Sequence, residues 1–204
     1  MTSQLDKARA FRALHERPGA FIIPNPWDVG TAKLLAAMGF EALATTSLGV
    51  ANMFGSSGVS LDVILANARA IVEATDLPVS VDLENCGAHE PRGAAEAIRR
   101  AADTGAVGGS IEDFSGDRDR PIYDFAHAVE RVQAAVEVAR ALPIPFTLTA
   151  RAENFLHGRK DIDDTIRRCR PSRPLAPTSS MRRACTISPR SGRWRPRWAS
   201  RSTT

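Results

Sequence analysis

The sequence predicts an α/β fold of the TIM (β/α)8 type, cut short after about five βα units. Up to Arg168, short continuous apolar segments alternate with segments whose apolar residues recur every three to four positions. This alternation is typical of a parallel sheet covered by helices. Polar residues follow the C-terminal ends of four apolar segments, and a barrel gathers such residues into one site. An open doubly wound sheet has the same alternation but focuses its site at one switch point.

Each predicted strand is a short apolar segment bounded by turn-forming residues. The five segments are Ala20–Pro24, Glu41–Thr45, Pro78–Leu83, Val107–Glu112 and Phe146–Ala150. Their apolar character is continuous rather than alternating, which favours strands buried on both faces. The segments therefore predict one parallel sheet with helices covering it.

Helical spacing of apolar residues fills the intervals between these strands. The predicted helices are Thr31–Met38, Leu61–Ala74, Ala94–Ala102, Phe125–Ala141 and one that begins around Asp161–Arg168. Asp28, Asp62 and Asp161 suit helix starts, because Asp favours the N-cap and the first turn. Gly39 and Gly105 stand between a helix and the next strand, where a helix commonly ends. Two Leu-Pro pairs also lie between a helix and the next strand, at Leu77-Pro78 and Leu142-Pro143.

Length and composition predict a soluble, cytoplasmic protein. The 204 residues can hold one sizeable core but fall short of the about 250 that are typical of a complete eightfold barrel. The chain has no apolar run of the roughly 20 residues that cross a membrane, and Met1–Ala10 lacks the apolar stretch of a signal peptide. Its three cysteines match neither a disulfide framework nor the spacing of a zinc site.

The chain divides into two unlike parts after Arg168. Residues 169–204 contain nine Arg, five Pro and two Trp, but no Lys, Asp or Glu. Of the chain's 27 Lys and Arg, 18 therefore lie in residues 1–168, against 23 Asp and Glu, which gives that part a formal charge of −5. We expect a partial β/α barrel over 1–168 and a disordered tail over 169–204. Only the tail supports a nucleic-acid binder, so we expect neither a nucleic-acid nor a membrane partner.

The tail has two explanations. One is a disordered basic segment. The other is translation in the wrong reading frame, after the loss of one base between Arg168 and Cys169. In that case, the last two bases of each codon in the original frame are read as the first two bases of the codon for the next residue. This rule permits a sequence that completes the helix begun at Asp161 and adds a strand, a loop, a helix and the start of another strand. We therefore predict a frame-shifted, non-native tail and a barrel that lacks its last strands.

Acidic side chains follow two neighbouring predicted strands. Alternation along the strand points Asp82 and Glu84 to the same face. Such a pair repels unless a cation neutralises it, and Mg²⁺ is often held by one or two carboxylates with waters. Glu112, at the end of the next strand, can add a direct or water-mediated contact. A lone pair of this kind is more often solvated, but the second acidic strand end favours a Mg²⁺ site, with Mn²⁺ as the alternative ion.

Groups that could bind an anion end two other strands. Arg151 ends the fifth predicted strand, where its guanidinium could clamp a substrate carboxylate through two hydrogen bonds. The alternative is an ion pair with Glu153 or Glu112. Thr46 and Ser47 end the second strand, and their hydroxyl and N–H groups could hold a carboxylate or an oxyanion.

Two further features lie near these strand ends. The segment Phe114–Tyr123 predicts a loop over the site, which is either a lid that excludes water or a plain solvated loop. Cys86 and His89 lie just past the acidic pair. Either could be a nucleophile or a ligand, but neither has a partner that the sequence identifies.

Taken in this order, these residues resemble the isocitrate lyase/phosphoenolpyruvate mutase superfamily, in particular its carboxyvinyl-carboxyphosphonate phosphorylmutase-like members. The resemblance covers about residues 10 to 168. It is carried by Pro24-Asn25-Pro26-Trp27-Asp28, Ala44-Thr45-Thr46-Ser47-Leu48-Gly49, Val81-Asp82-Leu83-Glu84, Ser110-Ile111-Glu112-Asp113 and Thr149-Ala150-Arg151. The restored reading frame extends it, because it contains a segment that looks like the family's next strand.

The resemblance implies a β/α barrel, usually oligomeric, that acts on a small 2-oxo or 2-hydroxy carboxylate. The implied reaction cleaves or forms a C–C or P–C bond next to the 2-oxo acid, with Mg²⁺ stabilising the enolate. Asp82 and Glu84 match the metal positions, and Glu112 matches a position that contacts the metal or its water. Arg151 matches the arginine that binds the substrate carboxylate. The loop that holds the carboxylate and oxo group is matched by Thr46, Ser47 and Leu48.

Three segments depart from the family pattern, and these departures reduce the range of activities that we expect. The loop Phe114–Asp119 has neither the Cys nor the Lys of the superfamily's cysteine-dependent lyases, which argues against isocitrate or methylisocitrate lyase activity. Gly55–Gly58 replaces a Pro-Asp pair, and Asn85–Ala88 replaces a Gly-aromatic-Gly segment. The first hypothesis is therefore a Mg²⁺-dependent lyase-family enzyme, with a phosphonopyruvate-type mutase or hydrolase as the alternative within the family. The second is an inactive, truncated product of a frame-shifted gene.

Overall fold

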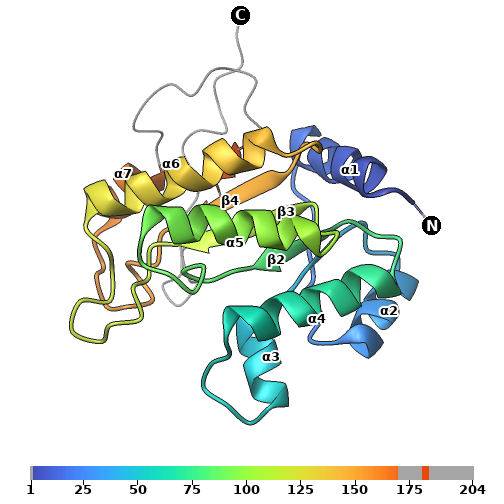
Figure 1. The fold of residues 1–204 in the computed structure, drawn as a ribbon, viewed down its shortest axis with the longest axis horizontal. Helices are drawn as coiled ribbons and strands as arrows, with labels where there is room; N and C mark the ends of the chain where they lie inside the picture. Colours follow the sequence, from blue (N-terminus) through green and yellow to red (C-terminus); the bar gives the residue numbers. More distant parts are fainter. Residues whose placement is uncertain (1, 170–180, 184–204) are drawn as a thin grey trace, which may run out of the picture.

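Five strands form one parallel sheet in the computed structural model, which describes residues 2–169 and 181–183. In chain order they are β1 Leu43–Ala44, β2 Val79–Asp82, β3 Gly108–Glu112, β4 Thr147–Arg151 and β5 Met181–Arg183. Each strand pairs in parallel with the next, so the spatial order follows the chain order (Figure 1). The predicted parallel α/β architecture is therefore confirmed.

Seven helices are described between and before these strands. They are α1 Gln4–Glu16, α2 Val29–Ala37, α3 Ser47–Met53, α4 Leu61–Ala74, α5 Pro91–Asp103, α6 Phe125–Ala141 and α7 Ile162–Cys169. Asp28 caps α2 as predicted, since its side chain accepts a hydrogen bond from the N–H of Thr31. Asp161 accepts from the N–H of Asp164 at the start of α7. None of the described helices is long and apolar enough to span a bilayer.

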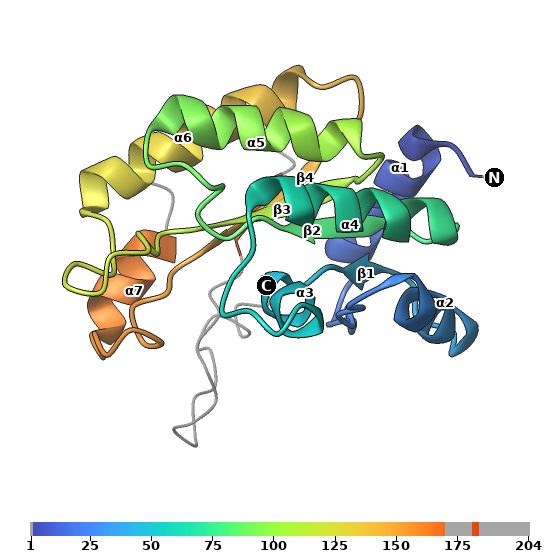
Figure 2. The ribbon, with the colours of Figure 1, turned by 60° about the horizontal axis from the view of Figure 1, so that its bottom comes forward.

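The main core lies between the sheet and one layer of helices. α4, α5 and α6 cover one side of the sheet (Figure 2). Buried apolar side chains of β2, β3 and β4 pack there against α4, α5 and α6; they include Val81, Ile111 and Leu148 from the strands and Ile64, Ile98 and Val136 from the helices. This layer buries the apolar faces that the helical spacing predicted.

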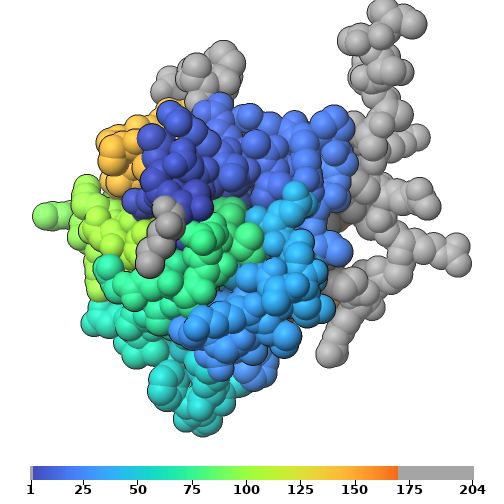
Figure 3. Space-filling model, turned by 90° about the vertical axis from the view of Figure 1, so that its right-hand side faces the viewer, coloured from blue at the N-terminus to red at the C-terminus, as the bar shows by residue number. Residues whose placement is uncertain are grey.

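The helix α1 was not predicted. Its N-cap is Ser3, whose side chain accepts from the N–H of Asp6, and it buries Ala8 and Phe11 against Ala42 and Val107. Figure 3 shows α1 in dark blue beside segments drawn in green, yellow-green and orange. Its contacts include hydrogen bonds from Gln4 to the carbonyl oxygens of Ala102 and Ala106, just before β3. α1 therefore covers the N-terminal ends of the strands and leaves their C-terminal ends open for a site.

The prediction of a strand at Ala20–Pro24 is wrong. This segment has no regular secondary structure, and its carbonyl at Pro24 accepts one hydrogen bond, from the N–H of Ala44 in β1. Pro24 and Pro26 have no N–H to donate, so this stretch cannot complete a ladder with β1. The segment still runs along β1 at the position that a first barrel strand would take.

The sheet is open within the described residues, with β1 and β5 at its edges. β5 lies in the segment for which the sequence predicted disorder, so that expectation does not hold for residues 181–183. Without β5, β4 would be an edge strand, and the backbone N–H and C=O groups of an edge strand pair readily with any extended segment. Apart from Cys169, the last residue of α7, and residues 181–183, the predicted tail lies outside the described residues.

Candidate active site and metal centre

Three carboxylates contact one guanidinium at the C-terminal ends of three adjacent strands, and a fourth acts electrostatically on one of them. Asp82 ends β2, Glu112 ends β3 and Arg151 ends β4; Glu84 and Glu153 follow two residues after β2 and β4. We call Asp82, Glu84, Glu112 and Glu153 the acidic cluster. Glu112 lies directly opposite Arg151 in the strand register. The structure therefore brings together the strand-end residues that the sequence singled out.

The carboxylate of Asp82 is held from two sides. Its Oδ2 accepts hydrogen bonds from the backbone N–H of Ser47 at 3.0 Å and from the Ser47 hydroxyl at 2.9 Å. Its Oδ1 accepts from the hydroxyl of Ser110, 3.2 Å away. The N–H of Asp82 in turn donates to the Thr45 hydroxyl. Asp82 is thus oriented by β1, α3 and β3 together, with Oδ1 the less fully engaged of its two oxygens.

The position of Glu84 does not come from strand alternation. β2 ends at Asp82, and Glu84 has a φ of +50°, in the left-handed region that a non-glycine residue rarely adopts. Cys86, with a φ of +64°, continues the same turn. Strained backbone of this kind often occurs at functional sites. The carboxylate of Glu84 contributes to raising the pKa of Glu112, so it still acts electrostatically on the cluster.

Glu112 is a buried member of the cluster with a strongly shifted pKa. Its pKa is raised to about 8 overall, chiefly by burial and further by the negative charges of Glu153, Asp82 and Glu84, while Arg151 acts to lower it. Its side chain is 9% exposed. Burial is therefore the main cause of the shift, and the three neighbouring carboxylates add to it.

The guanidinium of Arg151 is engaged on every nitrogen. Its Nη1 lies 2.6 Å from Glu112 Oε1 and 3.5 Å from Asp82 Oδ1. Its Nε and Nη2 lie 3.1 and 3.0 Å from Glu153 Oε1. Burial lowers the pKa of Arg151, but Glu112, Glu153 and Asp82 raise it by more, so the side chain stays cationic. The ion pairs with Glu112 and Glu153, which the sequence left as alternatives to a substrate contact, are both present.

The predicted carboxylate-binding loop is the first turn of α3. The hydroxyl of Thr46 caps this helix by accepting from the N–H of Gly49. Ser47 directs its N–H and hydroxyl to Asp82. Leu48 is 63% exposed. The polar groups of Thr46 and Ser47 therefore serve the protein's own structure here, and their contact with a substrate stays a prediction.

The loop after the acidic pair is fixed by a buried arginine. Arg131, on α6, donates to the carbonyl oxygens of Asn85, Ala88 and His89. Burial raises the pKa of the Cys86 thiol to about 12. Because a nucleophilic cysteine needs a lowered pKa, this environment does not favour Cys86 as a nucleophile. His89 bonds through Nδ1 to the Tyr123 hydroxyl at 2.7 Å.

The predicted lid segment forms an ordered turn. Phe114 and Ile122 are joined by an antiparallel bridge, and the N–H of Ser115 donates to the carbonyl of Pro121. The ring of Phe114 stacks on His157 with ring centroids 4.0 Å apart. These contacts tie the segment to the loop after β4, and a lid movement remains a prediction.

Sequence reasoning did not assign roles to Ser110 and Thr45, which orient Asp82. Both were visible as hydroxyl residues at strand ends. Ser110 lies opposite Asp82 in the register of β2 and β3, but this register could not be fixed from the sequence. It depends on how neighbouring strands align in space.

The residues present fit a divalent cation. In the described part of the chain, no group of three or more His, Cys, Asp or Glu side chains is arranged to hold a metal ion by itself. A cation here would therefore take Asp82 and Glu84 and complete its shell with water, as Mg²⁺ commonly does. The chemistry of the donor set supports this, because Asp82, Glu84 and Glu112 offer carboxylate oxygens, which are the ligands that Mg²⁺ takes.

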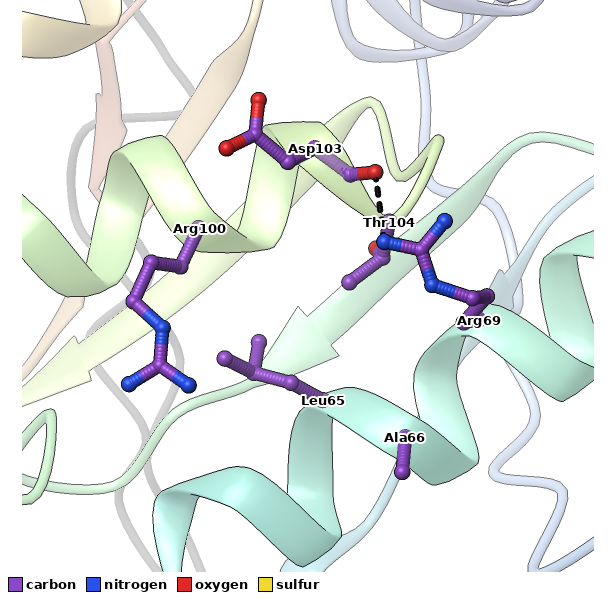
Figure 4. Close-up of a pocket in the computed structure, with 6 residues that line it drawn as sticks. All are labelled: Leu65, Ala66, Arg69, Arg100, Asp103 and Thr104. Atoms are coloured by element: carbon purple, nitrogen blue, oxygen red, sulfur yellow. Dashed lines mark hydrogen bonds between the residues drawn. The ribbon is translucent and has the colours of Figure 1, made fainter.

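A separate hollow lies on the outside of the helical layer. Its volume is about 270 Å³, and it lies between α4 and α5, lined by Leu65, Ala66, Arg69, Arg100, Asp103 and Thr104 (Figure 4). Arg69 donates there to the backbone carbonyl of Asp103 at 2.9 Å. Because α5 ends at Asp103 and leads into β3, this hollow is at the opposite end of the strands from the acidic cluster.

Parallel strands with helices on one side and convergent polar residues at the C-terminal ends define an α/β-barrel type of enzyme fold. The sequence model of phosphoenolpyruvate phosphomutase matches residues 11–171. The chain therefore belongs to this family, within the phosphoenolpyruvate mutase/isocitrate lyase superfamily, whose members are lyases and phosphomutases. The suspected superfamily is confirmed.

Proteins with similar sequences are longer than this chain. An uncharacterized protein of Mycobacterium tuberculosis is 31% identical over 165 residues, which is 78% of this chain and 59% of the relative. A Burkholderia cenocepacia J2315 structure, provisionally assigned as a lyase/mutase, has a TM-score of 0.80 and 60% identity, and covers 81% of this chain and 60% of that chain. This chain thus spans about three fifths of the length of these two relatives.

A more distant structure agrees in fold alone. It is a phosphonopyruvate hydrolase in complex with oxalate and Mg²⁺, with a TM-score of 0.73 and 19% identity. It covers 79% of this chain and 57% of that chain.

Proposed function

We propose that this chain is the N-terminal part of a Mg²⁺-dependent enzyme of the lyase class. The proposed reaction cleaves or forms a C–C or P–C bond next to the carboxylate of a small 2-oxo or 2-hydroxy acid. The single observation that carries the proposal is the acidic cluster with Arg151 at the C-terminal ends of β2, β3 and β4. Family membership and the Mg²⁺ and oxalate bound by a hydrolase of the same fold support it.

Each group has a proposed role. Asp82 and Glu84 would hold Mg²⁺, or Mn²⁺ as the alternative, with Glu112 contacting the ion or its water. When bound, the ion would polarise the oxo group and offset the negative charge that develops as the neighbouring bond breaks. Arg151 would bind the substrate carboxylate, and Ser47 would orient Asp82. The backbone around Thr46, Ser47 and Leu48 is the proposed wall on the other side of the substrate.

A direct test is turnover of 2-oxo and 2-hydroxy dicarboxylates, followed by NMR with added Mg²⁺ or with EDTA. The appropriate protein is the full-length form of this family member, since the site needs the rest of the barrel to enclose a substrate. We expect C–C cleavage with Mg²⁺ and none with EDTA. Equal turnover in EDTA would contradict the proposed metal dependence.

The alternative within the family is a phosphonopyruvate-type mutase or hydrolase. The absence of Cys and Lys from the sequence Phe114–Asp119 argues against the cysteine-dependent lyases and leaves this alternative open. The two are distinguished by phosphonopyruvate as substrate, because a hydrolase or mutase changes its ³¹P spectrum. We also propose that the enzyme forms a homo-oligomer and that it is located in the cytoplasm.

We also propose that residues 169–204 are frame-shifted and that the 204-residue chain has little lyase activity by itself. The match to the family ends at residue 171, close to the boundary that the composition indicates. The change in charge at the same point supports this. Sequencing the DNA tests it: an additional base at codons 168–169 should restore an open frame past residue 204, and stop codons in that frame would exclude it.

A further inference from the structure

Each nitrogen of the Arg151 guanidinium already contacts one or more of the protein's own carboxylates. Its Nη1 contacts Glu112 and Asp82, while its Nε and Nη2 contact Glu153. A substrate carboxylate can take two parallel hydrogen bonds from a guanidinium only if some of these contacts are released. The proposed substrate-binding role of Arg151 therefore requires a change of partners.

The charges around Arg151 also oppose an incoming anion. Three carboxylates of the acidic cluster lie within 3.5 Å of Arg151, and the charge of the fourth, Glu84, acts on Glu112. A carboxylate ligand would meet like charges at close range, in a partly buried site where screening by water is reduced. A cation bound to Asp82 and Glu84 would remove this repulsion.

We infer that Arg151 is the built-in counterion of the acidic cluster in the metal-free protein, and that a divalent cation competes with it for Asp82 and Glu112. Glu153 is the positioning residue, because it holds Nε and Nη2 from the opposite side while Nη1 faces the other acids. A bound cation displaces Nη1 from the acids and makes it available to the substrate carboxylate. Metal binding therefore precedes and strengthens carboxylate binding. The inference rests on the proposed function.

The competition makes a specific prediction about a residue that does not touch the metal. Removing the Arg151 charge should tighten Mg²⁺ binding, because the ion no longer displaces a guanidinium. We expect Arg151→Met to bind Mg²⁺ about tenfold more tightly than the wild-type chain. Arg151→Lys, which keeps a unit charge, should stay within about threefold of it.

The test is isothermal titration calorimetry of Mg²⁺ into the EDTA-treated 204-residue chain. Arg100→Met is the matched control, since it also removes one positive charge but lies between α4 and α5, paired with Asp62. Its Mg²⁺ affinity should equal that of the wild type. Circular dichroism establishes that each variant is folded before titration.

A second measurement does not depend on the methionine variant folding. The Nε–H signal of Arg151 in the NMR spectrum of the wild-type chain is identified by its loss in Arg151→Lys. We expect this signal to shift when Mg²⁺ saturates the site, and oxalate to bind at least about tenfold more tightly with Mg²⁺ than in EDTA.

The outcomes separate the two claims. If Mg²⁺ binds the wild type and Arg151→Met equally, or saturates the wild type without moving the Arg151 signal, the counterion inference is wrong and the proposed function stands. If Mg²⁺ binds none of the proteins, the proposed metal site is wrong, and the inference is wrong with it.

Discussion

At the scale of single residues, Asp82 has its orientation fixed before any ligand binds. Ser47 contributes both its N–H and its hydroxyl to Oδ2, and Ser110 contributes a hydroxyl to Oδ1. Mutation of a partner that orients a metal ligand typically lowers metal affinity about 10- to 100-fold. Ser47, expected from the sequence to contact substrate, is therefore best tested through its effect on the metal.

Ser47→Ala removes one of the two hydrogen bonds to Asp82 Oδ2 and leaves the backbone N–H in place. We expect Mg²⁺ affinity to fall about tenfold, as measured by calorimetry. Ser57→Ala, in the exposed turn after α3, is the control and should leave affinity unchanged. An unchanged affinity in Ser47→Ala would show that this hydroxyl does not support the site.

The raised pKa of Glu112 predicts that the free energy of unfolding depends on pH. Its pKa is raised from 4.5 to about 8 by burial and by neighbouring carboxylates. Between these values the folded protein keeps a proton that the unfolded chain has released, so stability falls as pH rises and levels off above about 8. Urea unfolding in EDTA at several pH values should show this decline. Glu112→Gln should flatten it, and an unchanged slope in this variant would contradict the assignment.

Residue types at strand ends could be predicted from the sequence, but their pairing could not. Asp82, Glu112 and Arg151 stood out because each follows an apolar segment. That Glu153 engages two nitrogens of Arg151 depends on side-chain geometry after β4. That Glu84 sits in a left-handed turn depends on where β2 ends. Neither feature has a signature in the sequence.

At the scale of elements, periodicity located the long helices and missed the short or peripheral ones. The bounds of α4 and α6 agree with the prediction, because their apolar spacing is sustained over 14 and 17 residues. α3 has only seven residues, and its polar start resembles a loop. α1 has a signal that could have been used, since Ser3 and Asp6 form a typical N-terminal pattern.

α7 is attached to the site by one buried side chain. Arg168 is 5% exposed and contacts Asp113 at 3.2 Å and Asp164 at 2.8 Å. It also donates to the carbonyl of Tyr123. Burial raises the pKa of Asp164, but hydrogen bonds from Arg168, Arg167 and other donors lower it to about 2 overall. Arg168 therefore joins α7 to β3 and to the end of the predicted lid segment.

Arg168→Met removes the ion pair of the buried Asp113 and one of the partners of Asp164, so we expect a loss of about 3 kcal/mol in the free energy of unfolding, measured with urea. Arg159→Met is the matched control, because Arg159 is 49% exposed and lies 3.8 Å from the same Asp164. Its cost should stay below about 1 kcal/mol. Similar losses in the two variants would show that the buried contacts of Arg168 contribute no more to stability than the exposed contact of Arg159.

At the scale of the whole molecule, the described sheet has two free edges and several exposed apolar side chains. β1 and β5 are the edges. The exposed apolar residues include Ile22, Leu34, Met38, Leu48 and Phe54. Exposed edges and apolar surface of this kind favour association. A chain that spans about three fifths of its relatives is consistent with surfaces that other parts of a barrel would cover.

The frame-shift proposal predicts a difference between two proteins. A chain with the reading frame restored after residue 168 should elute as one discrete species and turn over its substrate with Mg²⁺. The 204-residue chain should show little turnover and should associate. Size-exclusion chromatography and the NMR assay compare them, and substantial turnover by the 204-residue chain would refute the proposal.

The central claim is that the acidic cluster binds a divalent cation through Asp82. Calorimetric titration of Mg²⁺ into the EDTA-treated wild-type chain and into Asp82→Asn tests it most directly. Asp82→Asn keeps the shape of the side chain and removes its charge. We expect one Mg²⁺ site in the wild type and its loss in the variant. A wild-type chain that binds no Mg²⁺, or a variant that binds it equally well, would contradict it.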